Sequence, residues 1–122
     1  MTKSLGLACF IVLALGAEAS ARCSVPIIAT LGNQTVDGRM TVSSGDRCAI
    51  RMRHSAGPMH SAEIVQQPSN GTVVIEPPHR IIYRSRPGYV GNDSFTYARR
   101  GLDTRNNPSV RTVRISVRVT AR

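Results

Sequence analysis

The chain has 122 residues, with 16 Lys and Arg against 7 Asp and Glu, and its formal net charge at pH 7 is +9. This length is that expected of one domain with a modest core. The positive surplus favours anionic partners, such as lipopolysaccharide, acidic polysaccharide, nucleic acid or acidic protein. Lys3 is the single lysine, but a GC-rich genome replaces Lys by Arg regardless of function, so the information lies in the net charge.

The first 21 residues have the three parts of a secretory signal peptide. Lys3 gives a positive start, residues 5–17 are apolar but too short to span a bilayer comfortably, and residues 19–21 form a small-residue cleavage site. A membrane anchor or a buried helix is the alternative. We expect cleavage before Arg22, no transmembrane anchor afterwards, and one exported domain of residues 22–122, in the periplasm or outside the cell.

That domain keeps two cysteines, Cys23 and Cys48. In an oxidising compartment an even pair most simply forms one disulfide. The chain-entropy effect of closing such a loop stabilises the fold by about 3 kcal/mol. A reactive or metal-binding thiol pair is the alternative, but the spacing is far too long for a Cys-x-x-Cys unit.

Short stretches of alternating apolar and polar residues recur between Gly, Pro and Asn breaks, at the spacing typical of a sandwich or barrel. The first stretch, residues 23–31, contains Pro26 and is expected to be an edge strand or an extended arm. About seven short strands with one disulfide predict an all-β protein with an antiparallel β-sandwich fold. The strands expected after the first stretch are 38–42, 47–53, 60–67, 72–76, 80–84, 94–100 and 111–122.

The final stretch, residues 111–122, has the clearest alternation. Such a pattern indicates a half-buried strand of an antiparallel sheet. Val110 is out of phase with it, which predicts a bulge or a strand that starts near Thr112. The inward residues are expected to be Val113, Ile115, Val117 and Val119, and the outward ones Arg114, Ser116, Arg118 and Thr120.

Residues 67–75 read QPSNGTVVI, residues 87–97 read PGYVGNDSFTY, and an isolated tyrosine lies between them. Followed by the alternating final strand, this pattern resembles the bacterial Ig-like or cadherin-like repeat over residues 65–119. The resemblance implies an Ig-like sandwich, here in a single copy where the family usually forms tandem arrays. The sequence departs from the family at Ser85, where a Pro often stands, and in the loop of residues 101–109. The motif positions are Gly71, Tyr83, Gly88, Tyr89, Gly91, Asp93, Phe95 and Tyr97.

Elementary chemistry gives these motif residues scaffold roles. Gly88 and Gly91 permit turn conformations that other residues avoid, and Asp93 can accept bonds from the backbone amides that follow it. Phe95 and Tyr97 share one face of a strand and are expected in the core. Tyr97 is also placed for a tyrosine corner, with its hydroxyl bonded to upstream backbone. The alternative is a ligand site of aromatics and arginines, but the exported domain has too few aromatic rings to spare them from its core.

Candidates for metal binding or catalysis are sparse. His54, Met59 and His60 are close in sequence, and Met and His can bind copper. Their spacing fits no copper motif, so we expect an ordinary loop, with weak metal binding as the alternative. Calcium would have to use Asp93 and Asp103. The sequence contains no nucleophile elbow, phosphate loop or His-Glu-x-x-His motif, so we expect no cofactor, no metal and no enzymatic activity.

Arginines occupy outward positions of two expected strands and flank the aromatic segment. Guanidinium groups suit phosphate and carboxylate because they bond them with two parallel donors. If the strands are neighbours, these side chains form one basic stripe; the alternative is a solvated face that protects strand edges. The candidate anion-binding residues are Arg51, Arg53, Arg84, Arg86, Arg99, Arg100, Arg114 and Arg118.

Two functions of different classes follow. The first is an exported Ig-like module with a non-catalytic interaction or structural role, whose partner is a protein or the envelope. The second is a secreted cationic binder of anionic glycan or lipopolysaccharide, whose affinity should fall steeply with ionic strength. Export and a disulfide argue against intracellular nucleic acid as the partner.

Overall fold

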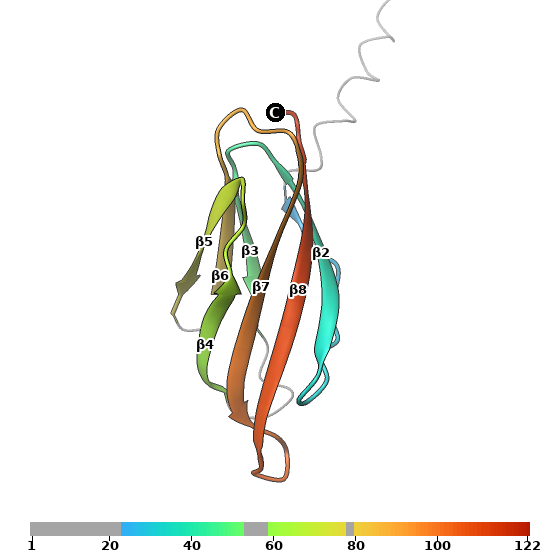
Figure 1. Ribbon diagram of the computed structural model, residues 1–122, viewed down its shortest axis with the longest axis vertical. Coiled ribbons are helices and arrows are strands. Elements are labelled where there is room, and N and C mark those ends of the chain that lie inside the picture. The colour runs from blue at the N-terminus through green and yellow to red at the C-terminus, as the bar shows by residue number, and fades with distance from the viewer. Residues whose placement is uncertain (1–22, 53–58, 78–79) are drawn as a thin grey trace, which may run out of the picture.

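Two β-sheets pack face to face in the computed structural model, which describes residues 23–52, 59–77 and 80–122 (Figure 1). Sheet A has five strands in the order β1-β2-β8-β7-β4, and sheet B has three in the order β3-β6-β5. The strands are β1 (Cys23–Ser24), β2 (Thr35–Ser43), β3 (Arg47–Arg51), β4 (Met59–Gln66), β5 (Gly71–Glu76), β6 (Arg80–Ser85), β7 (Gly91–Leu102) and β8 (Pro108–Thr120).

The strand order is that of an immunoglobulin-like sandwich. β3, β6 and β5 follow the order of strands B, E and D, while β4, β7 and β8 follow that of C, F and G. β2 lies along the other side of β8 and runs parallel to it, from Thr35↔Thr112 to Ser43↔Thr120. The predicted all-β, Ig-like sandwich is confirmed. The described residues form eight strands, and one strand pair is parallel, so the sandwich is not wholly antiparallel.

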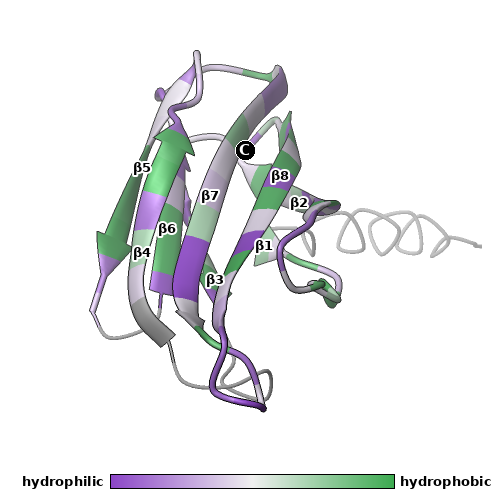
Figure 2. Ribbon diagram, turned by 60° about the horizontal axis from the view of Figure 1, so that its bottom comes forward, coloured by the Kyte–Doolittle hydropathy of each residue, from purple (hydrophilic) through white to green (hydrophobic). Residues whose placement is uncertain are grey.

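The alternating pattern of the final strand explains how the core is built. From Thr112 to Thr120 its apolar residues point between the sheets, and its polar residues point outward. Figure 2 shows this alternation as green and purple bands along β8. The prediction for the inward face of this strand is therefore confirmed. The inward residues, each at most 2% exposed, are Val113, Ile115, Val117 and Val119.

The start of β8 differs from the prediction. Val110 was expected to mark a bulge or a start near Thr112, but β8 begins at Pro108 and its pairing with β7 continues without a shift through Arg100↔Val110. Asn33, at a φ of 57°, donates its backbone N–H to the Val110 carbonyl at 2.7 Å and accepts from the Val110 amide through Oδ1 at 3.1 Å. Val110 therefore bonds to Asn33 on the side of β8 that faces away from β7. The register shifts occur in β4 instead.

The expected first strand is mostly an arm. Only Cys23–Ser24 pair with β2, and residues 25–34 have no regular strand pairing. Val25 and Ile28 of this arm still pack against the hydrophobic core. The arm therefore covers the edge of sheet A without extending it.

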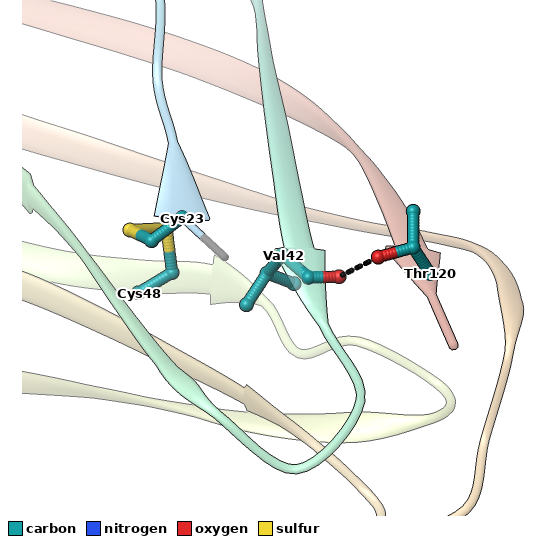
Figure 3. Close-up of a disulfide and its surroundings, with 4 residues drawn as sticks. All are labelled: Cys23, Val42, Cys48 and Thr120. Atoms are coloured by element: carbon teal, nitrogen blue, oxygen red, sulfur yellow. Dashed lines mark hydrogen bonds between the residues drawn. A yellow bond between two sulfur atoms is a disulfide. The ribbon is translucent and has the colours of Figure 1, made fainter. Parts of the chain in front are cut away.

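The predicted disulfide joins Cys23 and Cys48, whose Cα atoms are 5.3 Å apart. It links β1 of sheet A to β3 of sheet B, beside Val42, which pairs with Cys23 (Figure 3). On the other side of β2, the Thr120 hydroxyl donates to the Val42 carbonyl at 3.4 Å. The disulfide thus fastens the two layers together at one end of the sandwich.

Three parts of the chain, residues 1–22, 53–58 and 78–79, lie outside the described residues. The predicted signal peptide and two of the singled-out side chains, Arg53 and His54, fall there. No helix in the described ranges is long and apolar enough to cross a membrane.

Candidate anion-binding surface

Asp93 of β7 is the centre of the motif that carries the family resemblance. Its Oδ1 accepts the backbone amides of Ser69 at 3.1 Å and Ser94 at 2.9 Å. Its Oδ2 accepts the amide of Asn70 at 3.2 Å and the hydroxyl of Tyr83 at 2.8 Å. One carboxylate therefore ties the β4–β5 turn, β6 and β7 together, across both sheets. This is a scaffold role, and it leaves the carboxylate no evident capacity for a ligand.

Three aromatic rings form one cluster in the core, in which Tyr83 stacks on Phe95 and Tyr97 is tilted against Phe95. The ring centroids of Tyr83 and Phe95 are 5.8 Å apart with nearly parallel planes, and those of Phe95 and Tyr97 are 6.5 Å apart. All three residues are at most 3% exposed. Burial raises the pKa of Tyr97 to about 12, and burial followed by the bond to Asp93 raises the pKa of Tyr83. These rings stay neutral and build the core, as the sequence predicts.

The tyrosine corner expected at Tyr97 is not found. Within the described residues, no hydrogen bond joins the Tyr97 hydroxyl to upstream backbone. The bonded hydroxyls are those of Tyr83, which donates to the Asp93 side chain, and Tyr89, which donates to the Asn92 carbonyl. Neither of these two hydroxyls bonds to backbone upstream of its own residue.

The turn before β7 uses its arginine internally. The amide of Tyr89 donates to the Arg86 carbonyl at 3.1 Å, and Gly88 between them has a φ of 85°, which favours glycine. The Arg86 guanidinium lies 5.7 Å from the centre of the Tyr89 ring and donates to Asn70 Oδ1 at 3.0 Å. Gly71, the residue after Asn70, begins β5. A glycine is needed there because β5 passes so close to β6 that a Cβ would lie 2.5 Å from a backbone carbonyl oxygen of β6.

The outer face of sheet B carries four arginines in two opposed pairs. The antiparallel register of β3 and β6 places Arg47 directly opposite Arg84 and Arg51 directly opposite Arg80. All four side chains are exposed. Directly opposed residues have Cβ atoms about 4.5–5.5 Å apart, where like charges repel. We refer to these four residues as the arginine quartet.

Only one carboxylate among the described residues contacts the quartet. Glu76 of β5 lies 3.4 Å from Arg47 and 3.7 Å from Arg80. Arg84 donates to the carbonyl of Gly45 at 2.9 Å, and Arg51 has no ion pair or hydrogen bond in the described part of the chain. Four arginines and one glutamate leave this face strongly positive.

An apolar row separates the two arginine pairs. Ala49 of β3, Ile82 of β6 and Val74 of β5 are neighbours across the sheet. They lie on the outer face, because their neighbours Ile81 and Tyr83 point into the core. Ile82 is 5% exposed and Val74 is 57% exposed. The face therefore offers cations at both ends and an apolar strip in the middle.

The outer face of sheet A has a second, weaker set of arginines. Arg114 forms an ion pair with Asp37 at 3.1 Å. Arg39 and Arg118 are exposed on the neighbouring rows, and neither has a carboxylate partner among the residues described. Serine and threonine side chains fill the positions between them.

The predicted basic stripe does not form from the residues that were chosen for it. Arg51 lies on sheet B, whereas Arg114 and Arg118 lie on sheet A. The outer faces of a sandwich point in opposite directions, so these side chains cannot contact one ligand surface together. Arg53, the remaining member of the predicted stripe, is outside the described residues.

The arginines that flank the aromatic segment also separate. Arg84 belongs to the quartet, and Arg86 is held in the turn before β7. Arg100 forms an ion pair with Glu63 at 2.9 Å on the outer face of sheet A. Arg99 points the other way, into the sandwich, and is 8% exposed.

Arg47 and Arg80 are the quartet members that the candidate set lacks. Their outward direction could have been read from the alternation in residues 47–51 and 80–84, where Ile50, Ile81 and Tyr83 point inward. Their opposition to Arg84 and Arg51 could not, because the pairing of β3 with β6 joins segments that are distant in sequence. Only the register shows that four arginines meet.

The two aspartates considered for calcium have other partners. The oxygens of Asp93 accept four hydrogen bonds, as described above. Asp103 Oδ1 accepts the backbone amides of Arg105 at 2.8 Å and Asn107 at 2.9 Å, and these bonds hold the pKa of Asp103 below its usual value. Both carboxylates therefore organise loops.

Copper binding, the alternative considered for His54, Met59 and His60, receives no support from the described residues. Met59 and His60 begin β4, but their side chains and His54 lie outside the described atoms. In the described part of the chain, no three His, Cys, Asp or Glu side chains lie close enough to hold a metal ion.

Comparison with known protein families, with curated proteins and with solved structures finds no match for this chain. The likeness to bacterial Ig-like or cadherin-like repeats therefore stays a prediction that rests on the motif residues. The sandwich itself is shown by the strand order.

Proposed function

We propose that this protein is an exported, non-catalytic binding module that holds an anionic glycan of the cell envelope on the outer face of sheet B. The observation that carries the proposal is the arginine quartet, in which two pairs of like charges are opposed on adjacent strands. An anionic ligand would turn that repulsion into attraction.

The energetic argument starts from the free protein. Like charges directly opposite each other on adjacent strands destabilise a sheet, by an amount of the order of a few tenths of a kcal/mol for exposed pairs. Glu76 offsets part of this for Arg47 and Arg80, while Arg51 has no partner among the described residues. A face selected only for stability would alternate its charges. The retained repulsion is explained if an anion binds there.

The spacing of the pairs indicates an extended ligand. Arg47 and Arg51 are four residues apart on β3, so the two pairs are separated by about 13 Å along the strands. A single carboxylate, that of Glu76, contacts one member of each pair, Arg47 and Arg80, and leaves Arg51 and Arg84 without a carboxylate among the described residues. A glycan chain with repeated acidic groups can reach these arginines as well, and the apolar face of a sugar ring suits the exposed Val74.

Export is supported by the Cys23–Cys48 disulfide, because such bonds persist in oxidising compartments. The signal-like segment of residues 1–21 points the same way. Both support export, and an exported protein would meet acidic polysaccharide and lipopolysaccharide rather than intracellular nucleic acid.

Binding of the mature chain to heparin, a sulfated glycan, across a series of salt concentrations tests the proposal. In one variant, Arg47, Arg51, Arg80 and Arg84 are all changed to Gln. The matched control changes Arg39, Arg105, Arg114 and Arg118 to Gln, which removes the same charge from exposed positions outside sheet B. We expect the quartet variant to lose at least tenfold in affinity and to show a shallower dependence on salt than the control, because fewer counterions are released.

Equal losses in the two variants would contradict the proposal, since they would show that net charge alone attracts the glycan. Binding of the wild-type chain no tighter than that of an unrelated protein of the same charge would contradict it as well. Thermal melting of both variants checks the fold. The quartet variant should melt no lower than wild type, because the substitution removes repulsion.

A further inference from the structure

A second group of arginines lies inside the sandwich, at the end opposite the disulfide. Arg99 of β7 and Arg111 of β8 are directly opposed in the ladder. Ser109 lies two residues before Arg111, on the same face of β8. This face is the inward one, because it also carries Tyr97 and Val113 of the core. Arg99 is 8% exposed and Ser109 is 6% exposed.

Arg111 has one structural partner and spare donors. Its Nη1 donates to the carbonyl of Thr30 at 2.8 Å and to the Thr30 hydroxyl at 3.0 Å, which fastens the arm of residues 25–34 to β8. Its Nε and Nη2 donate to no acceptor among the described residues. A Cβ on Gly32 would lie 3.1 Å from Ser109 Oγ and 3.7 Å from Arg111 Nη2, so these two polar atoms lie close to each other beside Gly32.

Arg99 and Ser109 have no hydrogen-bond partner for their side chains among the described residues. The Arg99 guanidinium has no hydrogen bond or ion pair in the described part of the chain, and the buried Ser109 hydroxyl has no hydrogen-bond partner. Desolvation, and then the charge of Arg111, lower the pKa of Arg99. The stem of Arg99 is enclosed by the sandwich, and two guanidiniums side by side without a carboxylate between them repel each other.

The acidic side chains of the described residues are occupied elsewhere. Four of them, Asp37, Asp46, Glu63 and Glu76, form ion pairs with other arginines. Asp93 and Asp103 accept backbone amides, as shown above. The described chain therefore supplies no carboxylate that could neutralise the pair of Arg99 and Arg111.

From this geometry we infer a binding site for one oxyanion group, a phosphate, sulfate or carboxylate, held between the guanidiniums of Arg99 and Arg111, with the Ser109 hydroxyl as a further donor. Guanidinium forks match the oxygen pairs of all three groups. Unlike the quartet on the outer face of sheet B, this site lies between the sheets and takes a single anionic group. The inference does not depend on the proposed glycan binding.

Calorimetric titration of the mature chain with sodium sulfate, inorganic phosphate or sodium acetate, each at constant ionic strength against sodium chloride, tests the site. The variant Arg99→Met keeps an apolar stem and removes the charge, and Arg39→Met is the matched control on an exposed arginine of sheet A that belongs to neither proposed site. We expect saturable binding of one anion per chain in wild type and in Arg39→Met, and none in Arg99→Met. Stronger binding of acetate would identify a carboxylate carrier, and stronger binding of sulfate or phosphate a tetrahedral one.

Thermal melting provides a second measurement on the same proteins. In chloride, Arg99→Met should melt no lower than wild type, because the repulsion between Arg99 and Arg111 is gone. The binding anion should raise the melting temperature of wild type and Arg39→Met with saturation, and that of Arg99→Met only by the small, unsaturated increase that salts such as sulfate give any protein.

The site would be disproved if none of the three anions binds wild type saturably, or if Arg99→Met binds as wild type does. Should Arg99→Met fail to fold, Ser109→Ala takes its place. Removal of the hydroxyl donor should weaken the anion affinity several-fold, and an unchanged affinity would equally count against the site.

Discussion

Asp93 and Arg99 occupy the same face of β7, six residues apart, and differ completely in how their charges are satisfied. Asp93 accepts four hydrogen bonds from three segments of the chain. Asp93 is partly buried, whereas Arg99 is 8% exposed and has no acceptor among the described residues. The rings of Phe95 and Tyr97 belong to the positions between them on this face. A charge with a complete set of partners indicates architecture, whereas one without partners indicates a role outside the folded chain.

The two ends of the sandwich differ in the same way. The Asp93 end also holds the disulfide, because Cys23 pairs with Val42, which pairs with Val119, which in turn pairs with Gly91 at the start of β7. The Arg99 end is held by the bonds of Arg111 to Thr30 and by the loop that Asp103 organises. We infer that one end stabilises the fold and the other is available for a ligand.

The largest expected effect on the free energy of unfolding comes from removing the disulfide at the Asp93 end. A double variant, Cys23→Ala with Cys48→Ala, should lower the free energy of unfolding by about 3 kcal/mol, because the unfolded chain regains the entropy that the disulfide removes. Urea unfolding of the variant and of the oxidised wild type measures this loss. A loss below about 1 kcal/mol would show that the Asp93 end does not depend on its disulfide.

Alkaline pH should weaken the same region through its tyrosines. The pKa of a tyrosine in the unfolded chain is about 10, but burial raises the pKa of Tyr97 to about 12 and that of Tyr83 as well. Above pH 10 the unfolded chain therefore binds fewer protons than the folded one. The free energy of unfolding is unaffected below that pH and falls as pH rises, by up to about 1.4 kcal/mol per pH unit for each tyrosine.

Urea unfolding between about pH 9 and pH 11 measures this slope. The variant Tyr97→Phe should lose one tyrosine's share of it. A slope that is equal in wild type and variant would show that Tyr97 ionises as readily in the folded protein as in the unfolded chain.

The smallest expected effects on the free energy of unfolding distinguish the hydroxyl of Tyr83 from that of Tyr97. Tyr83→Phe removes one of the four bonds to Asp93 and should cost about 1–2 kcal/mol, because a charged acceptor loses a partner. Tyr97→Phe should change the free energy of unfolding at neutral pH by less than that, since no hydrogen bond within the described residues uses its hydroxyl. Urea unfolding at pH 7 compares the two. A larger loss for Tyr97→Phe would restore the tyrosine corner that the sequence suggested.

The sequence predicts the features that depend on local pattern. The alternation of residues 111–122 correctly predicts which side of β8 is buried, and a pair of cysteines in an exported domain correctly predicts the disulfide. Phe95 and Tyr97 are correctly placed in the core. In each case the signal lies within a few neighbouring residues, or in the number of cysteines.

What the sequence misses depends on which strands become neighbours. The parallel pairing of β2 with β8, the opposition of Arg47 to Arg84 and the position of Arg99 opposite Arg111 all join residues far apart in the chain. Val110 looks misplaced until Asn33 is seen to pair with it. Register is set by packing across the whole sheet, so the local pattern of either strand alone does not contain it.

The central comparison is tested most directly by urea unfolding of wild type, Asp93→Asn and Arg99→Met in one chloride buffer at pH 7. Asp93→Asn should lower the free energy of unfolding by about 2 kcal/mol or more, because it replaces an acceptor that satisfies four donors. Arg99→Met should raise it slightly, because it removes the repulsion from Arg111 and breaks no ion pair or hydrogen bond among the described residues. Opposite signs would support a satisfied scaffold at one end and a ligand site at the other. A comparable loss in both variants would contradict that division, because it would show that Arg99 stabilises the fold as Asp93 does.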